Sequence, residues 1–148
     1  MKFELATLSD LDAITELVTA VSAVDILPTF NEQGKNEFNQ RVLPDLATAL
    51  DPTQFLSLKA LNSEGELVGF GAMRDSNYIM HLFVAKSCQG QGLGKAMLQQ
   101  LLEFTSARTI SLRSSINGVG FYQANGFVAT DKEGEFNGIR FVPMTLER

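Results

Sequence analysis

Residues 82–95 read Leu-Phe-Val-Ala-Lys-Ser-Cys-Gln-Gly-Gln-Gly-Leu-Gly-Lys. An apolar strand runs into a turn that has glycine at positions 90, 92 and 94, and an amphipathic helix is expected to follow directly. The first backbone N–H groups of a helix have no partner within it and carry a partial positive charge, and glycine lets a phosphate approach the backbone closely. The stretch therefore predicts a site for a pyrophosphate.

Three other interpretations of this turn can be compared by spacing. A dinucleotide-binding G-x-G-x-x-G motif would need its third glycine at Lys95 and an early βαβ unit, which the chain lacks. A P-loop would need glycine in place of Gln89 and serine or threonine in place of Ala96. An ordinary strand-to-helix turn would not need so many glycines, each of which costs chain entropy on folding. None of these three interpretations accounts for the turn, whose pattern is Gln89-x-x-Gly92-x-Gly94.

A second motif lies at residues 114–127, Ser-Ser-Ile-Asn-Gly-Val-Gly-Phe-Tyr-Gln-Ala-Asn-Gly-Phe. Its aromatic pair, Phe121 and Tyr122, is followed after three residues by Gly126-Phe127. The two motifs together resemble the GCN5-related N-acetyltransferase superfamily, and the similarity extends over most of the chain. In one respect the chain departs from the family pattern, because Ser115 stands where the family usually has an asparagine that binds the cofactor.

The resemblance implies an acetyl-CoA-dependent N-acetyltransferase that passes the acetyl group to a primary amine by direct attack in a ternary complex. It implies that Tyr122 is the general acid that protonates the departing CoA thiolate. The residues that the resemblance assigns to acetyl-CoA are Leu82, Phe83, Val84, Gln89, Gly90, Gln91, Gly92, Leu93, Gly94, Lys95 and Ser115. A non-catalytic acyl-CoA-binding regulatory module is the alternative from another class, and a nucleotide-binding protein of another fold is a third.

The base that deprotonates the amine is not identified by the sequence. Alternation along the strand predicts that Tyr78, Met80 and Leu82 share one face and that His81 packs on the other face, under a helix. His81, a chain of water molecules and a carboxylate elsewhere in the chain all remain candidates. Cys88 could carry an acetyl group covalently, but the resemblance favours direct transfer and leaves Cys88 without a role.

The remaining pattern predicts one α/β domain over residues 1–148, with a mixed, mostly antiparallel sheet and helices on both of its faces. Ser9 and Asp12 have the spacing of a capping box at the start of the first helix. Helices are expected in the first helical segment up to Val21, in two short pieces of 31–50 divided at Pro44, and at 96–107 and 119–125. Strands are expected at 3–5, 55–61, 67–73, 78–85, 109–112, 127–130 and 139–146.

Residues 26–45 could cover the acceptor side of the cleft with apolar side chains. Ile26, Leu27, Phe30 and Phe38 are the candidates for such a lid, and simple packing of the short helices on the sheet is the favoured alternative. The late strands leave an edge at which a second copy could pair, so a homodimer is an expectation.

Composition excludes several classes of function. With one cysteine and one histidine, the chain cannot assemble a disulfide framework or a structural zinc site, and no metal is expected. Lys and Arg are scattered and the net charge is −5, so no nucleic-acid partner is expected. The acidic charge could favour cationic acceptors or merely aid solubility. Because no apolar run suits a signal peptide or membrane span, we expect no membrane partner and a cytoplasmic location.

Overall fold

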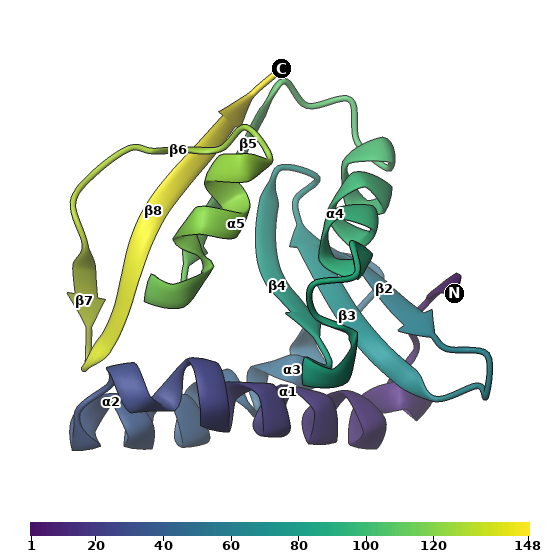
Figure 1. Ribbon diagram of the computed structural model, residues 1–148, viewed down its shortest axis with the longest axis horizontal. Helices are drawn as coiled ribbons and strands as arrows, with labels where there is room; N and C mark the ends of the chain where they lie inside the picture. Colours follow the sequence, from purple (N-terminus) through teal and green to yellow (C-terminus); the bar gives the residue numbers. More distant parts are fainter.

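The computed structural model describes all residues, 1–148, and its centre is one mixed sheet (Figure 1). β4 and β5 are its only parallel neighbours, and every other pair is antiparallel. The mostly antiparallel sheet predicted from the sequence is therefore confirmed. In spatial order the strands are β1 (Lys2–Leu5), β2 (Phe55–Leu61), β3 (Leu67–Arg74), β4 (Tyr78–Val84), β5 (Thr109–Ser114), β8 (Ile139–Glu147) and β6 (Val128–Ala129), with β7 (Gly134–Phe136) also paired to β8.

Helices cover both faces of the sheet, as expected. One face carries α1 (Leu11–Asp25), α2 (Glu32–Glu37) and α3 (Asp45–Thr48), which form the layer at the bottom of Figure 1. The other carries α4 (Leu93–Glu103) and α5 (Val119–Ala124), whose side chains share one apolar cluster. No helix is both long enough and apolar enough to cross a bilayer.

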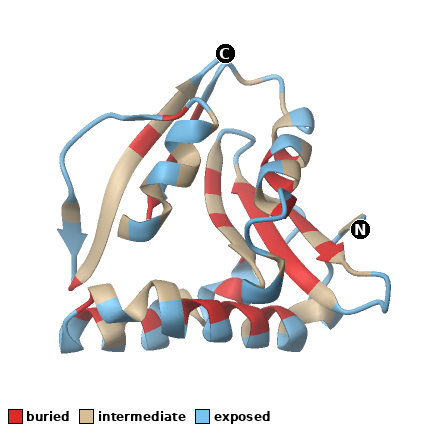
Figure 2. Cartoon of the chain, in the orientation of Figure 1, coloured by how far each residue is buried: buried red, intermediate tan, exposed pale blue.

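Strand β3 shows how one strand serves both layers. Phe70 and Ala72 are fully buried in the core on the α1 face. Gly69 and Gly71 point to the other face, where a Cβ atom on Gly71 would lie 2.9 Å from Cδ1 of Leu101 in α4. These glycines let α4 pack directly on the strand backbone, and the strand is buried along most of its length (Figure 2).

The first helix begins differently from the prediction. The capping box joins Thr7 to Asp10, with the Thr7 N–H donating to Asp10 Oδ2 at 2.9 Å, so the expected pair Ser9 and Asp12 was wrong. The carboxylate of Asp10 is also held by Lys59 Nζ on β2 at 2.9 Å, an interaction that no local pattern could reveal. A short 3-10 helix, η1 (Leu8–Asp10), precedes α1.

Other boundaries also differ. Helix α4 spans residues 93–103 instead of 96–107, because it starts directly at the glycine turn. The hairpin of β7 and β8 was missed, although its turn is Asn137-Gly138, both with positive φ (50° and 86°). Asn-Gly is the most common two-residue hairpin signal, so the sequence did contain the information.

The segment 26–45 belongs mainly to the core. Helix α2 continues into a π-helical turn (Phe38–Val42), and Pro44 precedes α3, as the division at this proline predicted. Phe30 and Phe38 are buried with α1 and α3, so the packing interpretation is confirmed for them. Of the four candidate lid residues, Ile26 alone lines the cleft described below.

Candidate functional site

The sheet divides between β4 and β5. These strands pair only at Tyr78 with Ser111 and at Ile79 with Leu112, after which they diverge and β5 continues beside β8 (Figure 1). A cleft of about 690 Å³ opens at the division. Its walls come from the end of α1, β4, the glycine turn, the end of β5 and α5.

A bulge in β4 changes which side chains share a face. Met73 pairs with Ile79 and Ala72 with His81, so Met80 has no partner on β3. Ile79 and Leu82 therefore both pack in the clusters on the α4 face. The predicted grouping of Tyr78, Met80 and Leu82 was wrong, because simple alternation does not continue through a bulge.

The backbone of β4 presents to the cleft groups that β3 does not bind. The N–H of Ala85, just after the strand, donates to the Val68 carbonyl of β3 at 2.9 Å. In an antiparallel pair, successive residues direct their backbone groups to alternate sides. The backbone groups of Leu82 and Val84 therefore point away from β3 and toward the division, whereas those of Phe83 point toward β3. Phe83 is among the residues that line the cleft, and its side chain packs against the α1 core.

The glycine turn presents a series of backbone donors. Gly90 and Gly92 have φ of 79° and 84°, which a side chain would strain, and Gly92 is the N-cap of α4. The N–H groups of residues 90–95 donate no hydrogen bond within the chain, and the N–H of Ala96 is the first to bond, to the Gly92 carbonyl. Adjacent free donors at the start of an eleven-residue helix fit a pyrophosphate.

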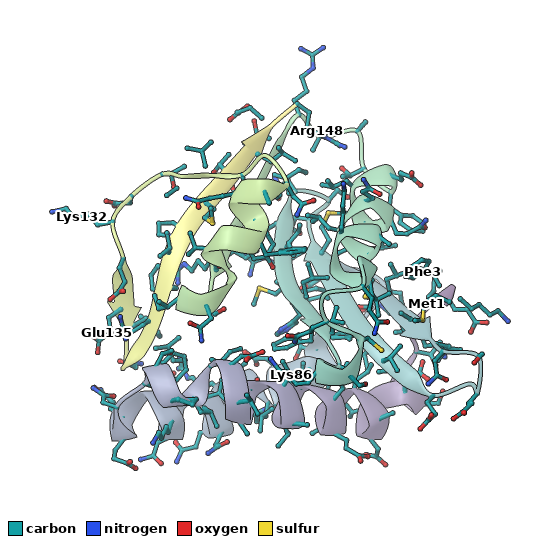
Figure 3. All side chains as sticks on the ribbon, viewed as in Figure 1. Met1, Phe3, Lys86, Lys132, Glu135 and Arg148 are labelled. Carbon is teal, nitrogen blue, oxygen red and sulfur yellow. The ribbon has the colours of Figure 1, made fainter.

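Side-chain hydrogen bonds connect the turn to α1. Lys86, labelled in Figure 3, donates from Nζ to Asp25 Oδ1 and to Gln89 Oε1, both at 2.9 Å. Gln89 Nε2 donates to the Val84 carbonyl at 3.1 Å. Asn117 Nδ2, beyond β5, donates to the Asp25 carbonyl and so links the opposite wall to α1. Gln89 thus orders the turn with its side chain.

Most of the predicted acetyl-CoA residues line this cleft. Two do not: Gln91 donates from Nε2 to the Ser87 carbonyl at 3.2 Å, and Leu93, the first residue of α4, is buried between that helix and the sheet. The backbone N–H groups of both residues nevertheless belong to the free series. The predicted residues that line the cleft are Leu82, Phe83, Val84, Gln89, Gly90, Gly92, Gly94, Lys95, Ser115 and Tyr122.

Tyr122 lies in the cleft wall formed by α5. Its ring packs edge-on against Phe121 and Phe127, with ring centroids 5.1 and 5.5 Å apart, and its hydroxyl makes no hydrogen bond within the chain. Burial raises the pKa of Tyr122 well above the ordinary value of a phenol. The hydroxyl is therefore protonated at neutral pH and free to donate.

His81 lies on the α1 face of β4. Its ring is about 6 Å from those of Phe70 and Phe83, and its buried Nε2 atom has no hydrogen-bond partner. Burial lowers the pKa of His81 to about 4, so the side chain is neutral at pH 7. The packing of His81 beneath a helix was predicted; its place in the wall of the cleft was not.

Cys88 lies at the end of a 3-10 helix, η4 (Lys86–Cys88), and does not line the cleft. No group of three or more His, Cys, Asp and Glu side chains is arranged to hold a metal ion.

Comparisons with known proteins agree with this geometry. The family model described as an acetyltransferase (GNAT) domain matches residues 26–148. None of the curated proteins matches the sequence.

Several solved structures have the same fold at low identity. A GCN5-related N-acetyltransferase from Rhodopseudomonas palustris has a TM-score of 0.79 and 19% identity, over 99% of this chain and 95% of that one. The PaiA N-acetyltransferase from Thermoplasma acidophilum, in complex with coenzyme A, has a TM-score of 0.74 and 18% identity, over 100% of both chains. An aminoglycoside 6′-N-acetyltransferase complexed with coenzyme A has a TM-score of 0.72 and 13% identity, over 99% of this chain and 97% of that one.

The family model covers most of the chain, and these structures extend the fold to its first strand and helix. The chain therefore belongs to the GNAT acetyltransferase family and is an N-acetyltransferase.

Proposed function

We propose that this enzyme transfers an acetyl group from acetyl-CoA to a primary amine by direct attack while both substrates are bound. The observation that carries the proposal is the series of free N–H groups at residues 90–95, beside the division between β4 and β5. Acetyl-CoA supplies an activated acetyl thioester and two groups, a pyrophosphate and an extended arm, that fit the turn and the division. The CoA complexes of two structural relatives support this choice of cosubstrate.

The turn binds the pyrophosphate through its backbone. Free N–H groups and the positive end of α4 stabilise negative charge at the same point. Lys95 lines the cleft and adds one cation there. The hydrogen bonds of Gln89 hold the turn in this conformation before any ligand binds, which lowers the entropy cost of binding.

The division holds the thioester. The free N–H of Leu82 is positioned to stabilise the negative charge that develops on the carbonyl oxygen during attack. The bulge at Met80 supports this role, since it separates β4 from β5 just before Leu82. Removing one such donor typically costs about 10²–10³ in kcat.

Tyr122 protonates the leaving group. A neutral phenol beside the sulfur can donate a hydrogen bond to the leaving thiolate and pass its proton to it, because burial in the same cleft raises the pKa of a thiol as well as that of a phenol. The raised pKa of Tyr122 keeps its proton in place until sulfur acquires negative charge. The absence of any internal partner for the hydroxyl supports this role, because no competing hydrogen bond must break.

The amine must lose a proton before it attacks. An amine with a pKa near 10 is about a thousandfold protonated at pH 7, a deficit of about 4 kcal/mol. His81, with its pKa lowered to about 4, is too weak a base to hold that proton. Its neutral ring can accept a hydrogen bond from the amine or from a water molecule that carries the proton to solvent.

Ligand-dependent thermal melts test the choice of cosubstrate. Acetyl-CoA and CoA at about a hundred times the dissociation constant should stabilise the protein by about 2.7 kcal/mol and raise Tm by several degrees. ATP and NAD serve as matched controls and should give no shift. No shift with acetyl-CoA or CoA would refute the proposal, and a shift with ATP or NAD alone would favour another nucleotide.

Tyr122→Phe tests the general acid, because phenylalanine keeps the packing with Phe121 and Phe127. Thiol release should fall by about 10²–10⁴-fold in kcat, with the acetyl-CoA melt shift unchanged. Unchanged turnover would show that another group protonates the thiolate. A loss of acetyl-CoA binding would assign Tyr122 to binding instead.

A further inference from the structure

Arg113 lies at the point where the two arms of the sheet separate. It directly follows Leu112, whose pairing with Ile79 is the last between β4 and β5. Leu112 is buried in the cluster beside α4 and α5, so by alternation the Arg113 side chain points to the opposite face, where α1 lies. The glycine turn belongs to the α4 side, which leaves the α1 side for the acceptor.

The guanidinium group of Arg113 is held in place by an aromatic ring, and no carboxylate neutralises its charge. Its central carbon lies 4.4 Å from the centre of the Phe141 ring on β8. It makes no salt bridge and no hydrogen bond within the chain. Arg140, by contrast, is paired with Glu133 at 2.8 Å and bonds to the Thr29 carbonyl. Arg113 is therefore free to bind an anion.

The cleft offers no free carboxylate for a cation. Asp25 is the one acidic residue in its wall, and its carboxylate already binds Lys86 and approaches Gln89. His81 is neutral. The local charge on the acceptor side is thus positive, although the net charge of the chain is −5. Net charge alone had left a cationic acceptor open, whereas the charge of this cleft opposes one.

On the basis of the proposed transfer to an amine, we propose that the acceptor is a small primary amine that also carries a carboxylate, and that Arg113 binds this carboxylate. A planar guanidinium held against an aromatic ring can form two parallel hydrogen bonds to a carboxylate. The cleft of about 690 Å³ must also hold the arm of the cosubstrate, which favours a small acceptor. Binding at Arg113 leaves the amine end of the acceptor to extend toward Leu82.

Matched pairs of acceptors test this specificity. A panel of free amino acids, including β-alanine and γ-aminobutyrate, is compared with the corresponding amides, and spermidine serves as a polycationic probe. Each amide keeps the amine and loses the carboxylate charge; because this loss also lowers the pKa of the amine, kcat/KM is calculated from the concentration of the unprotonated amine. The wild type should show kcat/KM for the acids about 10–100-fold above that for the amides, the value expected for charge-assisted hydrogen bonds. Short peptides with an N-terminal aspartate or glutamate distinguish a peptide carboxylate from that of a free acid.

Arg113→Gln should abolish the preference by raising KM for the acids, with little change for the amides. Arg113→Lys should retain part of it, because the charge remains and the planar fork is lost. Arg108→Gln is the matched control, since Arg108 is an exposed arginine outside the cleft, and it should behave as wild type. Each variant is also melted with acetyl-CoA to establish that it is folded and binds the cosubstrate.

Equal or better turnover of amides or spermidine by the wild type would overturn the proposal, as would an unchanged preference in Arg113→Gln. Transfer to none of the carboxylate-bearing amines, with a normal acetyl-CoA shift, would overturn it too and leave the proposed cosubstrate standing. Only a missing acetyl-CoA shift would refute the proposed function itself.

Discussion

Gly94 of the glycine turn lies directly against the ring of Phe121 in α5. A Cβ atom on Gly94 would be only 3.1 Å from Cε1 of Phe121. The two sequence motifs that resemble the acetyltransferase family therefore meet at one edge of the cleft. The ring of Phe121 also packs against Tyr122, so the position of the turn affects that of the proposed acid.

Gly94→Val should weaken cosubstrate binding through the contact with Phe121. The added side chain must displace Phe121 or move the start of α4, and either change disturbs the free N–H groups. We expect the Kd for CoA to rise tenfold or more. The free energy of unfolding should fall by no more than about 1–3 kcal/mol, the usual cost of overpacking, because replacing a glycine near a helix start offsets part of the strain. Calorimetric titration with CoA and a urea melt measure the two quantities.

Gly120→Ala is the control for Gly94→Val. Gly120 lies in the same helix as Phe121, and no atom lies within 4 Å of where its Cβ would be. The Gly120→Ala variant should bind CoA as the wild type does, and its free energy of unfolding should equal or slightly exceed that of the wild type. Unchanged CoA affinity in Gly94→Val would contradict the role given to the contact.

Asp25→Ala tests whether the hydrogen bonds from α1 order the turn. The variant loses the interaction with Lys86 Nζ and keeps the backbone carbonyl that Asn117 binds. Because both side chains are partly exposed, stability should fall by less than about 1 kcal/mol. KM for acetyl-CoA should rise about three- to tenfold with kcat unchanged. Glu32→Gln, which breaks the remote pair with Lys35, should change neither parameter; equal KM values for both variants would refute the ordering role.

Local patterns predicted the glycine turn, the strands β2, β3 and β4 and the helices on both faces, because periodicity and glycine spacing record local conformation. They could not predict the bulge at Met80, which depends on how β4 pairs with β3. Nor could they show that Arg113 is unpaired or that Asp25 already has partners, since these facts depend on residues far apart in the chain. The fold was thus largely readable from the sequence, whereas the charge of the cleft was not.

The pH dependence of transfer should rise toward alkaline pH and then level off. The amine acceptor gains reactivity as it loses its proton, whereas the raised pKa of Tyr122 keeps the acid protonated beyond pH 10. We therefore expect no descending limb in kcat between pH 7 and pH 10. A descending limb in that range that disappears in Tyr122→Phe would show that the phenol ionises at an ordinary pKa.

His81 should make the protein less stable in mild acid. Its pKa is about 4 in the folded protein and about 6.5 in the unfolded chain, so between these values the unfolded state binds more protons. Stability is then lost as the pH falls through 6.5, by about 2 kcal/mol at pH 5, and the loss is complete below pH 4. Urea unfolding of the wild type and His81→Asn at pH 7.5 and pH 5 measures this contribution, because the carboxylates that also titrate are common to both proteins. The wild type should lose about 2 kcal/mol more than the variant between the two pH values; equal losses would mean that the imidazole can take up a proton where it lies and could serve as the base after all.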